Sequence, residues 1–331
     1  MKLLKAVLTP SILAISAILA FIVQAQAKTD APKVPPMPYS ALPAPTCAET
    51  VSVPGEAPSL LPAGRKFRLV WNDEFLGTRL DEGKWGYRVN FWDLEDMWFA
   101  RPDENAVEVS DGTVKLKLIR RADGSFASPQ LQTGSLSYEC HRAKRKPEDE
   151  GKRRGFWPFG RIPKPKFAHK YGYWECRCKL QQNPGWWSAF WIQAPAIGMT
   201  TDARQSGVEC DVMESFSPGT VVSHMLHYAG YGSQHERMCA YPGRRNGVIQ
   251  MDKTVFHTFG VLWERDGYTF YIDGRQSGEK VTKTVSDTEQ FILISTECQS
   301  YRKNGTWAKA LEKSLPDCFE VDYVRVYDEV R

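Results

Sequence analysis

Hydrophobic and polar residues alternate along several short stretches of this chain. The clearest alternation covers residues 67–71, 113–118, 172–180, 268–272 and 321–327. A period of two places successive side chains on opposite faces, which is typical of β-strands with one buried face. Helical spacing of apolar residues is scarce, and its best short candidate lies around residues 306–313. The pattern therefore predicts an all-β fold.

Turn residues separate these strands. Asp-Gly pairs occur at residues 111–112, 266–267 and 273–274, and such pairs favour the tight two-residue loops of β-hairpins. Short strands joined by hairpins indicate an antiparallel sandwich. One large domain of this kind accommodates residues 65–331.

The first 64 residues follow a different pattern. Two lysines precede an apolar run over residues 6–23, and Ala25-Gln26-Ala27 follows it, which predicts a secretory signal peptide over residues 1–27. A membrane anchor is the alternative, because the run is close to spanning length. The small-residue pattern and the lack of a basic cluster after it favour cleavage. Residues 28–64 are rich in Pro and Ala and predict an extended linker. We expect a secreted or periplasmic protein with no membrane partner after cleavage.

The cysteines and the net charge limit which metal sites and partners the protein can have. The eight cysteines lie at residues 47, 140, 176, 178, 210, 239, 298 and 318. In an exported protein they predict structural disulfides or buried thiols, and no His or further Cys follows Cys176 and Cys178 at zinc-ligand spacing. The formal net charge of +4 is mild and does not favour a nucleic-acid partner.

Residues 141–170 are an exception, because they are dense in Lys and Arg and interrupted by Pro. We interpret this segment as a long surface loop whose charges are solvated. A patch for an acidic or sulfated polymer is the alternative, since a basic surface concentrates polyanions.

Three acidic residues, Glu209, Asp211 and Glu214, lie within six positions of a strand-like segment. Crowded carboxylates raise one another's pKa, so the segment is a candidate for acid/base chemistry. Alternation places Glu209 and Asp211 on one face and gives Glu214 the opposite parity. A β-bulge near Val212-Met213 would bring all three to one face. A solvated or ion-paired strand face is the alternative that spacing alone leaves open.

Aromatic residues cluster in residues 184–191, directly before the carboxylates. Alternation places Trp187 and Trp191 on one strand face and the other large rings on the opposite face. We expect one set in the core and the other in a floor on which sugar rings stack. The next strand carries His227, which is a candidate for the same site.

Together these segments resemble glycoside hydrolase family 16, the β-jelly-roll endo-glycanases. The matching segments occur in the family's order, at residues 70–75 with 84–85, 133–135, 170–175, 185–191, 209–214, 256–260, 271–274 and 321–327. The resemblance implies an antiparallel β-jelly-roll sandwich with a concave substrate cleft. The spacing E-x-D-x-x-E is the bulged form, which laminarinase-like and agarase-like members carry.

The resemblance also implies roles for the acids. Glu209 is similar to the family's nucleophile, Glu214 to its general acid/base, and Asp211 to the residue that orients and tunes the pair. Cys210 replaces the usual aliphatic residue between the first two acids, and its parity predicts that it faces the core.

Further roles implied by the resemblance concern sugar binding and cofactors. Trp187 and Trp191 are expected to contact sugars, and Asn105 is expected on the cleft rim. No cofactor is required, although some members hold a structural calcium ion. A zinc hydrolase is excluded for want of clustered His ligands.

The implied function is a secreted, endo-acting, retaining β-glycanase, and a monomer is expected. β-1,3-Glucan of the laminarin type is the leading polysaccharide, and a galactan of the agar, porphyran, carrageenan or plant type is the alternative. Two other classes stay open on the same fold, a non-catalytic carbohydrate-binding protein and a transglycosylase. Retention of both glutamates argues against the binding protein.

Overall fold

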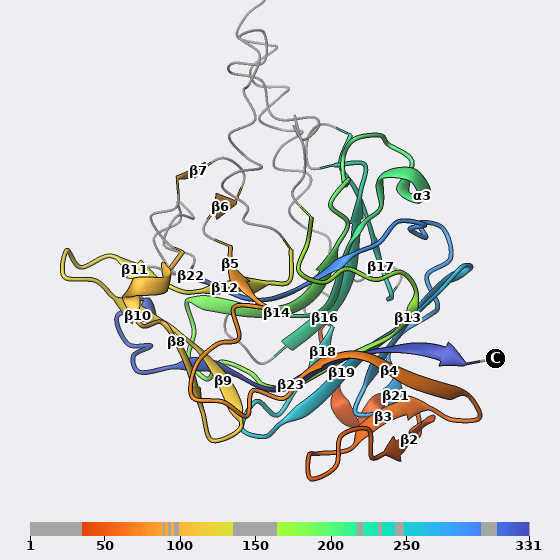
Figure 1. Cartoon of the computed structure of the whole chain (residues 1–331), viewed down its shortest axis with the longest axis horizontal. Helices are drawn as coiled ribbons and strands as arrows, with labels where there is room; N and C mark the ends of the chain where they lie inside the picture. Colours follow the sequence, from red (N-terminus) through yellow and green to blue (C-terminus); the bar gives the residue numbers. More distant parts are fainter. Residues whose placement is uncertain are drawn as a thin grey trace, which may run out of the picture. The chain divides into compact units, whose positions relative to one another are not determined.

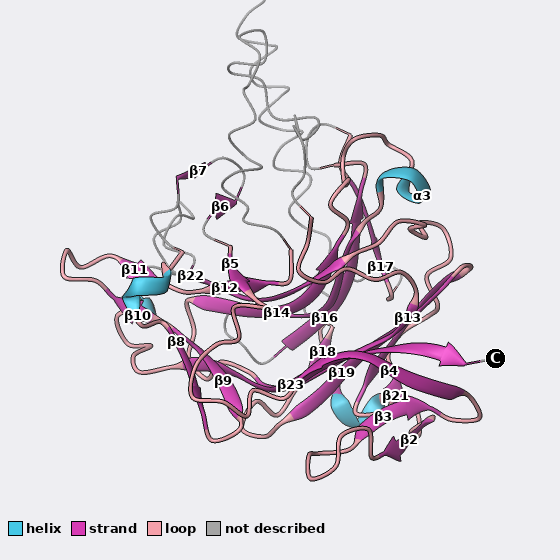
Figure 2. Ribbon diagram, in the orientation of Figure 1, coloured by secondary structure: helices cyan, strands magenta, loops and turns pink. Residues whose placement is uncertain are grey.

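The computed structural model describes residues 35–88, 99–134, 164–216, 221–230, 234–241, 248–298 and 310–330, and the backbone of residues 90–91 and 94–95. The predicted signal peptide, most of the basic segment, Cys140 and most of the candidate helix lie outside these residues. From Pro36 onward the described chain forms one compact unit, built mainly from two large sheets (Figures 1 and 2).

Two sheets contain most of the described strands. The nine-stranded sheet contains, in spatial order, β1 (Met37–Pro38), β18 (Ile249–Gln250), β16 (Val221–Tyr228), β15 (Glu209–Phe216), β14 (Trp186–Gln193), β22 (Phe291–Cys298), β12 (Gln130–Gln132) and β5 (Gly86–Tyr87), and β17 (Glu236–Cys239) pairs with β16. The eight-stranded sheet contains β21 (Arg275–Gln276), β20 (Gly267–Ile272), β19 (His257–Glu264), β13 (Gly172–Lys179), β23 (Cys318–Val330), β9 (Thr113–Lys117) and β8 (Val107–Ser110), and β4 (Lys66–Asp73) pairs with β23.

Smaller elements complete the described chain. Three two-stranded sheets pair β2 (Cys47–Thr50) with β3 (Ser59–Pro62), β6 (Asn90–Phe91) with β7 (Leu94–Glu95), and β10 (Ile119–Arg120) with β11 (Phe126–Ala127). The short helices are η1 (Tyr39–Ala41), η2 (Pro102–Glu104) and α3 (Ala203–Ser206). Of the helices in the described ranges, none combines the length and the apolar character that crossing a bilayer requires.

The predicted strands and hairpins are confirmed with one shift. All five predicted strands coincide with strands of the eight-stranded sheet. Asp111-Gly112 and Asp273-Gly274 both form two-residue turns with positive φ at each residue. At the third turn Gly267 already pairs with Glu264, so the loop lies one residue earlier than predicted. β22 was harder to predict, because it is buried along its whole length and its residues do not alternate.

The main core lies between the two large sheets. Cys210 and Val212 of β15 belong to the same buried cluster as Phe259 and Val261 of β19 and Val324 of β23. Two packed sheets exclude water in this way when the inner face of each presents apolar residues at every second position. Cys210 therefore faces the core, as its parity predicts, and the neighbouring acids of β15 project from the opposite face.

The described part of the predicted linker is folded. β1 pairs with β18, and the β2–β3 hairpin packs Leu61 among Tyr173 and Tyr271 of the eight-stranded sheet. Proline is tolerated here because these strands are short edge strands, where a missing N–H removes no ladder bond. Residues 36–64 thus belong to the domain rather than to an extended tether.

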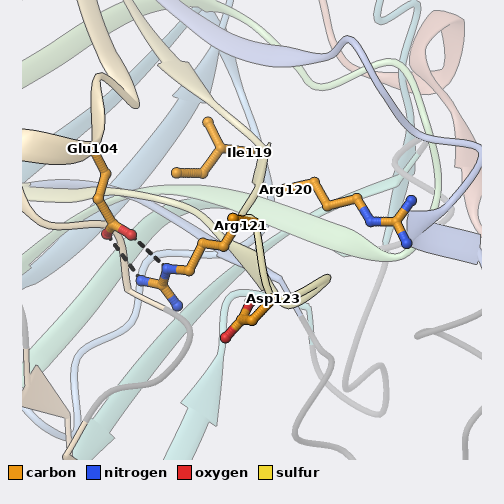
Figure 3. A pocket seen from close by; sticks show the side chains of 6 residues that line it. Glu104, Ile119, Arg120, Arg121 and Asp123 are labelled. Atoms are coloured by element: carbon orange, nitrogen blue, oxygen red, sulfur yellow. Dashed lines mark hydrogen bonds and ion pairs between the residues drawn. The ribbon is translucent and has the colours of Figure 1, made fainter.

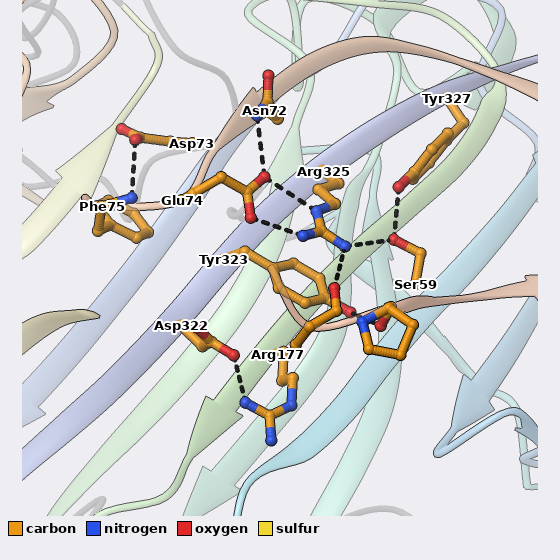
Figure 4. A network of polar contacts seen from close by, with 12 residues as sticks. Ser59, Asn72, Asp73, Glu74, Phe75, Arg177, Asp322, Tyr323, Arg325 and Tyr327 are labelled. Atoms are coloured by element: carbon orange, nitrogen blue, oxygen red, sulfur yellow. Dashed lines mark hydrogen bonds and ion pairs between the residues drawn. The ribbon is translucent and has the colours of Figure 1, made fainter. Parts of the chain in front are cut away.

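A buried ion pair ties this hairpin to the sheet (Figure 4). Arg325 is 0% exposed and donates to both carboxylate oxygens of Glu74, at 3.0 and 2.6 Å. Its Nη1 also donates to Ser59 Oγ at 2.7 Å and to the carbonyl oxygen of Ala57 at 2.9 Å. One guanidinium on β23 therefore contacts the residue that follows β4, the first residue of β3 and the segment that enters β3.

The cysteines correct one prediction. No two of the seven described cysteines are joined by a disulfide, so the predicted disulfides are wrong for these residues. Cys176, Cys178 and Cys210 are fully buried in the core between the sheets, where a thiol packs as a small apolar group. Burial also raises the pKa of Cys210 well above its usual value. The alternative prediction of buried thiols is confirmed.

Glu175 of β13 predicts a pH-dependent stability. Its carboxyl is 0% exposed and accepts from the Leu60 N–H at 2.7 Å, and burial raises its pKa from 4.5 to about 7. The folded state then binds a proton that the unfolded state releases between these values, so stability falls as pH rises from 4.5 to 7. We expect the wild type to lose about 3 kcal/mol relative to Glu175→Gln over this window.

Urea unfolding of both proteins between pH 4.5 and 8 measures this difference. The control is Glu49→Gln, because Glu49 is exposed on the β2–β3 hairpin that also contains Leu60. This variant should have the same unfolding free energy as the wild type at each pH. Parallel curves for the wild type and Glu175→Gln would contradict the prediction.

Candidate active site

A β-bulge in β15 gathers the three predicted acids. Asp211 pairs with Trp191 of β14, and Met213 pairs with the adjacent Phe190. Val212 is therefore the extra residue. The register with β16 shifts over the same residues, between Asp211 and Glu214. The predicted bulge is confirmed, and it returns the Glu214 side chain to the face that carries Glu209 and Asp211.

The neighbours of the acids follow from the register, because residues opposite each other in an antiparallel pair share a face. On β14, Gln193 lies opposite Glu209 and Ala189 lies opposite Glu214. Glu209 is 9% exposed and Asp211 is 3% exposed, whereas Glu214 is partly exposed. The acids therefore form a row in which Glu214 is the most accessible and Asp211 the most buried.

His227 of β16 lies opposite Glu209 of β15, as expected of a site residue. Its Nε2 is 3.4 Å from Asp211 Oδ2, and its Nδ1 is 2.7 Å from Nε2 of His235. Burial, and then the charge of Arg237, lowers the pKa of His227 to about 4. The imidazole is consequently neutral at pH 7, and its contact with Asp211 is not an ion pair.

Asp211 lies in the least solvated position of the three. Burial raises the pKa of Asp211 well above its usual value, and the charges of Glu214 and Glu209 raise it further. None of the described residues donates a hydrogen bond to its buried Oδ2. Asp211 therefore keeps its proton to a higher pH than an ordinary aspartate and can share that proton with the two glutamates.

The two predicted tryptophans lie on the same face as the acids. Trp191 is 5% exposed and donates from Nε1 to Ser295 Oγ of β22 at 2.9 Å. Trp187 is 7% exposed, and its ring centroid lies 5.3 Å from that of Phe216. Their shared face is confirmed, while their contact with sugars stays a prediction.

Several residues of this face were not predicted from the sequence. Gln193 Nε2 donates to Glu209 Oε2 at 3.2 Å, and Arg88 Nη1 donates to Gln193 Oε1 at 3.2 Å. Gln193 follows Trp191 by two positions, so alternation alone indicates it. Arg88 and His235 carry no such pattern, since one follows a two-residue strand and the other precedes β17.

Asn105 lies on the surface of the domain. It is exposed, has a left-handed φ of 53°, and connects η2 to β8 of the eight-stranded sheet. The adjacent Glu104 lines a surface pocket with Ile119, Arg120, Arg121, Ala122 and Asp123, where Arg121 Nη2 donates to Glu104 at 2.9 Å (Figure 3). The place of Asn105 on a cleft rim stays a prediction.

The acids and His227 also have to be considered as metal ligands. One oxygen each of Glu209 and Asp211 and one nitrogen of His227 lie within 4.8 Å of one another. Calcium prefers six to eight oxygen ligands, so two carboxylates beside an imidazole do not form a calcium site. The structural calcium that the resemblance allows stays a prediction.

Comparisons with known proteins point to one family. The model of "Glycosyl hydrolases family 16" matches residues 102–324. The chain is 26% identical over 292 residues to the "Glucan endo-1,3-beta-glucosidase A1" of Niallia circulans, which covers 81% of this chain and 39% of that protein. It is 24% identical over 287 residues to the "Beta-porphyranase B" of Phocaeicola plebeius, which covers 78% of this chain and 82% of that protein.

Solved structures show the same fold. The catalytic domain of an endo-1,3-beta-glucanase (laminarinase) from Thermotoga petrophila superposes with a TM-score of 0.52 at 19% identity, covering 81% of this chain and all of that domain. The predicted β-jelly-roll sandwich is thereby confirmed. A family match over two thirds of the residues, on the fold that the family adopts, shows that the chain belongs to glycosyl hydrolases family 16.

Proposed function

We propose that this protein is an endo-acting, retaining β-glycanase that cleaves β-1,3-glucan of the laminarin type. The observation that carries the proposal is the bulged strand β15, which presents three carboxyl groups on one face beside Trp191. The names of the curated relative from Niallia circulans and of the Thermotoga laminarinase support the choice of glucan.

The proposed reaction is a double displacement. Glu209 attacks the anomeric carbon while Glu214 gives a proton to the departing glycosidic oxygen, which yields a glycosyl ester and the reducing-end fragment. Glu214 then removes a proton from water, and the water oxygen attacks the same carbon and releases Glu209. Two inversions retain the configuration, and no cofactor is needed.

Asp211 assists this exchange in the proposal. When Glu209 forms the ester and Glu214 gives up its proton, the negative charge moves from Glu209 to Glu214, and Asp211 responds to that shift through its own proton. His227 lies 3.4 Å from Asp211 and is neutral, so it adds no charge of its own beside this carboxyl group.

A screen of polysaccharides tests the substrate. The purified protein is incubated with laminarin, lichenan, agar, porphyran and carrageenan, and new reducing ends are measured. We expect the fastest release from laminarin, with products of several chain lengths because cleavage is internal. Proton NMR of the first product should show the β-anomer before mutarotation, and an α-anomer would contradict the retaining mechanism.

A galactan is the second candidate, because the relative from Phocaeicola plebeius is named a porphyranase. The basic segment, residues 141–170, gives this candidate little support in residues 164–170, which the structure describes. Lys166 donates to the Glu82 carbonyl oxygen at 2.5 Å, and Lys170 pairs with Asp287 at 3.2 Å. Faster cleavage of porphyran than of laminarin would favour this candidate.

The same screen separates the remaining classes. Binding without release of reducing ends would indicate a carbohydrate-binding protein, and products longer than the added oligosaccharide would indicate transglycosylation. We further propose that the protein is a monomer. We also propose a secreted or periplasmic location, which the signal-like pattern over residues 1–27 supports.

A further inference from the structure

Arg88 is an unusual residue on the face of the nine-stranded sheet that carries the acids. It follows β5, donates its backbone N–H to the Gln130 carbonyl at 2.9 Å, and is only 2% exposed. Its guanidinium carbon lies 5.1 Å from the ring centroid of Trp191. A guanidinium is costly to bury unless its donors and its charge are used.

One of those donors orients a neighbouring amide. Arg88 Nη1 donates to Gln193 Oε1 at 3.2 Å. Arginine offers donors only, so Gln193 has to turn its carbonyl oxygen toward Arg88 and its NH₂ group the other way. The chemistry of the contact, rather than packing alone, therefore determines the amide orientation.

The NH₂ group then meets Glu209. Gln193 is 4% exposed and lies directly opposite Glu209 across the strand pair, and its Nε2 donates to Glu209 Oε2 at 3.2 Å. A hydrogen bond from a buried donor favours the ionised carboxylate and restricts its rotation. If the amide were reversed, its oxygen would face the carboxylate and repel it.

We propose that Arg88 and Gln193 are positioning residues that act in series, Arg88 on Gln193 and Gln193 on Glu209, to keep this carboxylate ionised and aimed at the anomeric carbon. The proposal rests on the nucleophilic role of Glu209 proposed above. Neither residue exchanges protons with the substrate, and the bonds made and broken are those of the double displacement.

Kinetics of three variants test the series arrangement. Gln193→Leu removes the donor with little change of volume and should lower kcat/KM about 10- to 100-fold. The acidic limb of its pH–rate profile should move up by about one pH unit, because the carboxylate ionises less readily. Arg88→Met should shift the limb in the same direction by less.

The double variant separates series from independent action. Arg88→Met/Gln193→Leu should shift the acidic limb no further than Gln193→Leu alone, because the proposed effect of Arg88 on Glu209 passes through the amide. Limb shifts that add in the double variant, or an acidic limb that does not move in Gln193→Leu, would overturn the proposal. Arg88→Lys keeps a buried cationic donor and should retain most of the wild-type profile, which covers the case in which Arg88→Met fails to fold.

A matched glutamine serves as the control. Gln130 of β12 is equally buried and donates to Glu297 rather than to Glu209. Gln130→Leu should leave the position of the acidic limb unchanged. A shift equal to that of Gln193→Leu would mean that the limb reports general loosening of the sheet and would overturn the proposal.

A measurement without substrate distinguishes this proposal from the proposed function. Infrared titration of the wild type against Glu209→Gln isolates one carboxylate band, and its midpoint should rise in Gln193→Leu. If no polysaccharide is cleaved, the proposed function fails while the titration still decides the positioning. An unmoved midpoint in an active enzyme rejects the positioning alone.

Discussion

Replacement of Glu209 by Ala is expected to lower the rate of polysaccharide cleavage by at least about 10⁴-fold, because the covalent route then has no nucleophile. Glu214→Ala is expected to cost about 10²- to 10⁴-fold, since it removes the proton donor and the base. Both acids project from the outer face of β15, away from the core. Truncation should therefore leave the fold intact.

Azide distinguishes the two roles. With an activated aryl β-glycoside, azide can enter the space left in Glu209→Ala and attack from the side of the missing carboxylate, which gives an α-glycosyl azide. In Glu214→Ala, azide replaces the water of the second step and gives the β-glycosyl azide. The products are identified by NMR, and the opposite stereochemistry would exchange the roles of the two glutamates.

The control for both variants is Glu175→Gln. Glu175 is a fully buried acid of the other large sheet, and its replacement should leave the rate of cleavage within a few-fold of wild type. Near-normal activity in Glu209→Ala or Glu214→Ala would reject the mechanism.

Loss of the buried ion pair between Glu74 and Arg325 is expected to have the largest effect on stability. Glu74→Ala leaves a guanidinium that is 0% exposed without its carboxylate, and such a change costs about 3–5 kcal/mol of unfolding free energy. Replacement of both residues, Glu74→Leu with Arg325→Met, should cost less than Glu74→Ala, because no charge is then stranded.

Urea unfolding at pH 7 measures these differences. The control is Arg68→Ala, which removes an ion pair between β4 and β23 where the Arg68 side chain is 70% exposed. An exposed pair contributes about 0–1 kcal/mol. Equal losses in Arg68→Ala and Glu74→Ala would show that burial is not the source of the effect.

Local patterns in the sequence were sufficient for much of this structure. Alternation predicts the strands that become β4, β9, β13, β20 and β23, and Asp-Gly pairs predict two hairpins at their observed positions. The parity of Glu214 requires a bulge near Val212, and the bulge is present. These features depend on neighbouring residues, whose geometry is the same in any sheet.

Other features depend on residues far apart in the chain. The Pro-rich residues 36–64 look like a linker until Ser59 meets Arg325 and Tyr327 across more than 260 positions. The cysteines suggest disulfides until the core encloses Cys176, Cys178 and Cys210. Composition and spacing carry no information on which distant segment covers a residue.

The division is clearest at the site. Sequence by itself determined which strand carries the acids and which tryptophans share their face, because a period of two and one extra residue are local properties. Only the tertiary structure decided that Arg88 and Gln193, 105 positions apart, meet beside Glu209, and that His227 is buried enough to stay neutral. Those outcomes follow from strand order and register, which long-range packing determines.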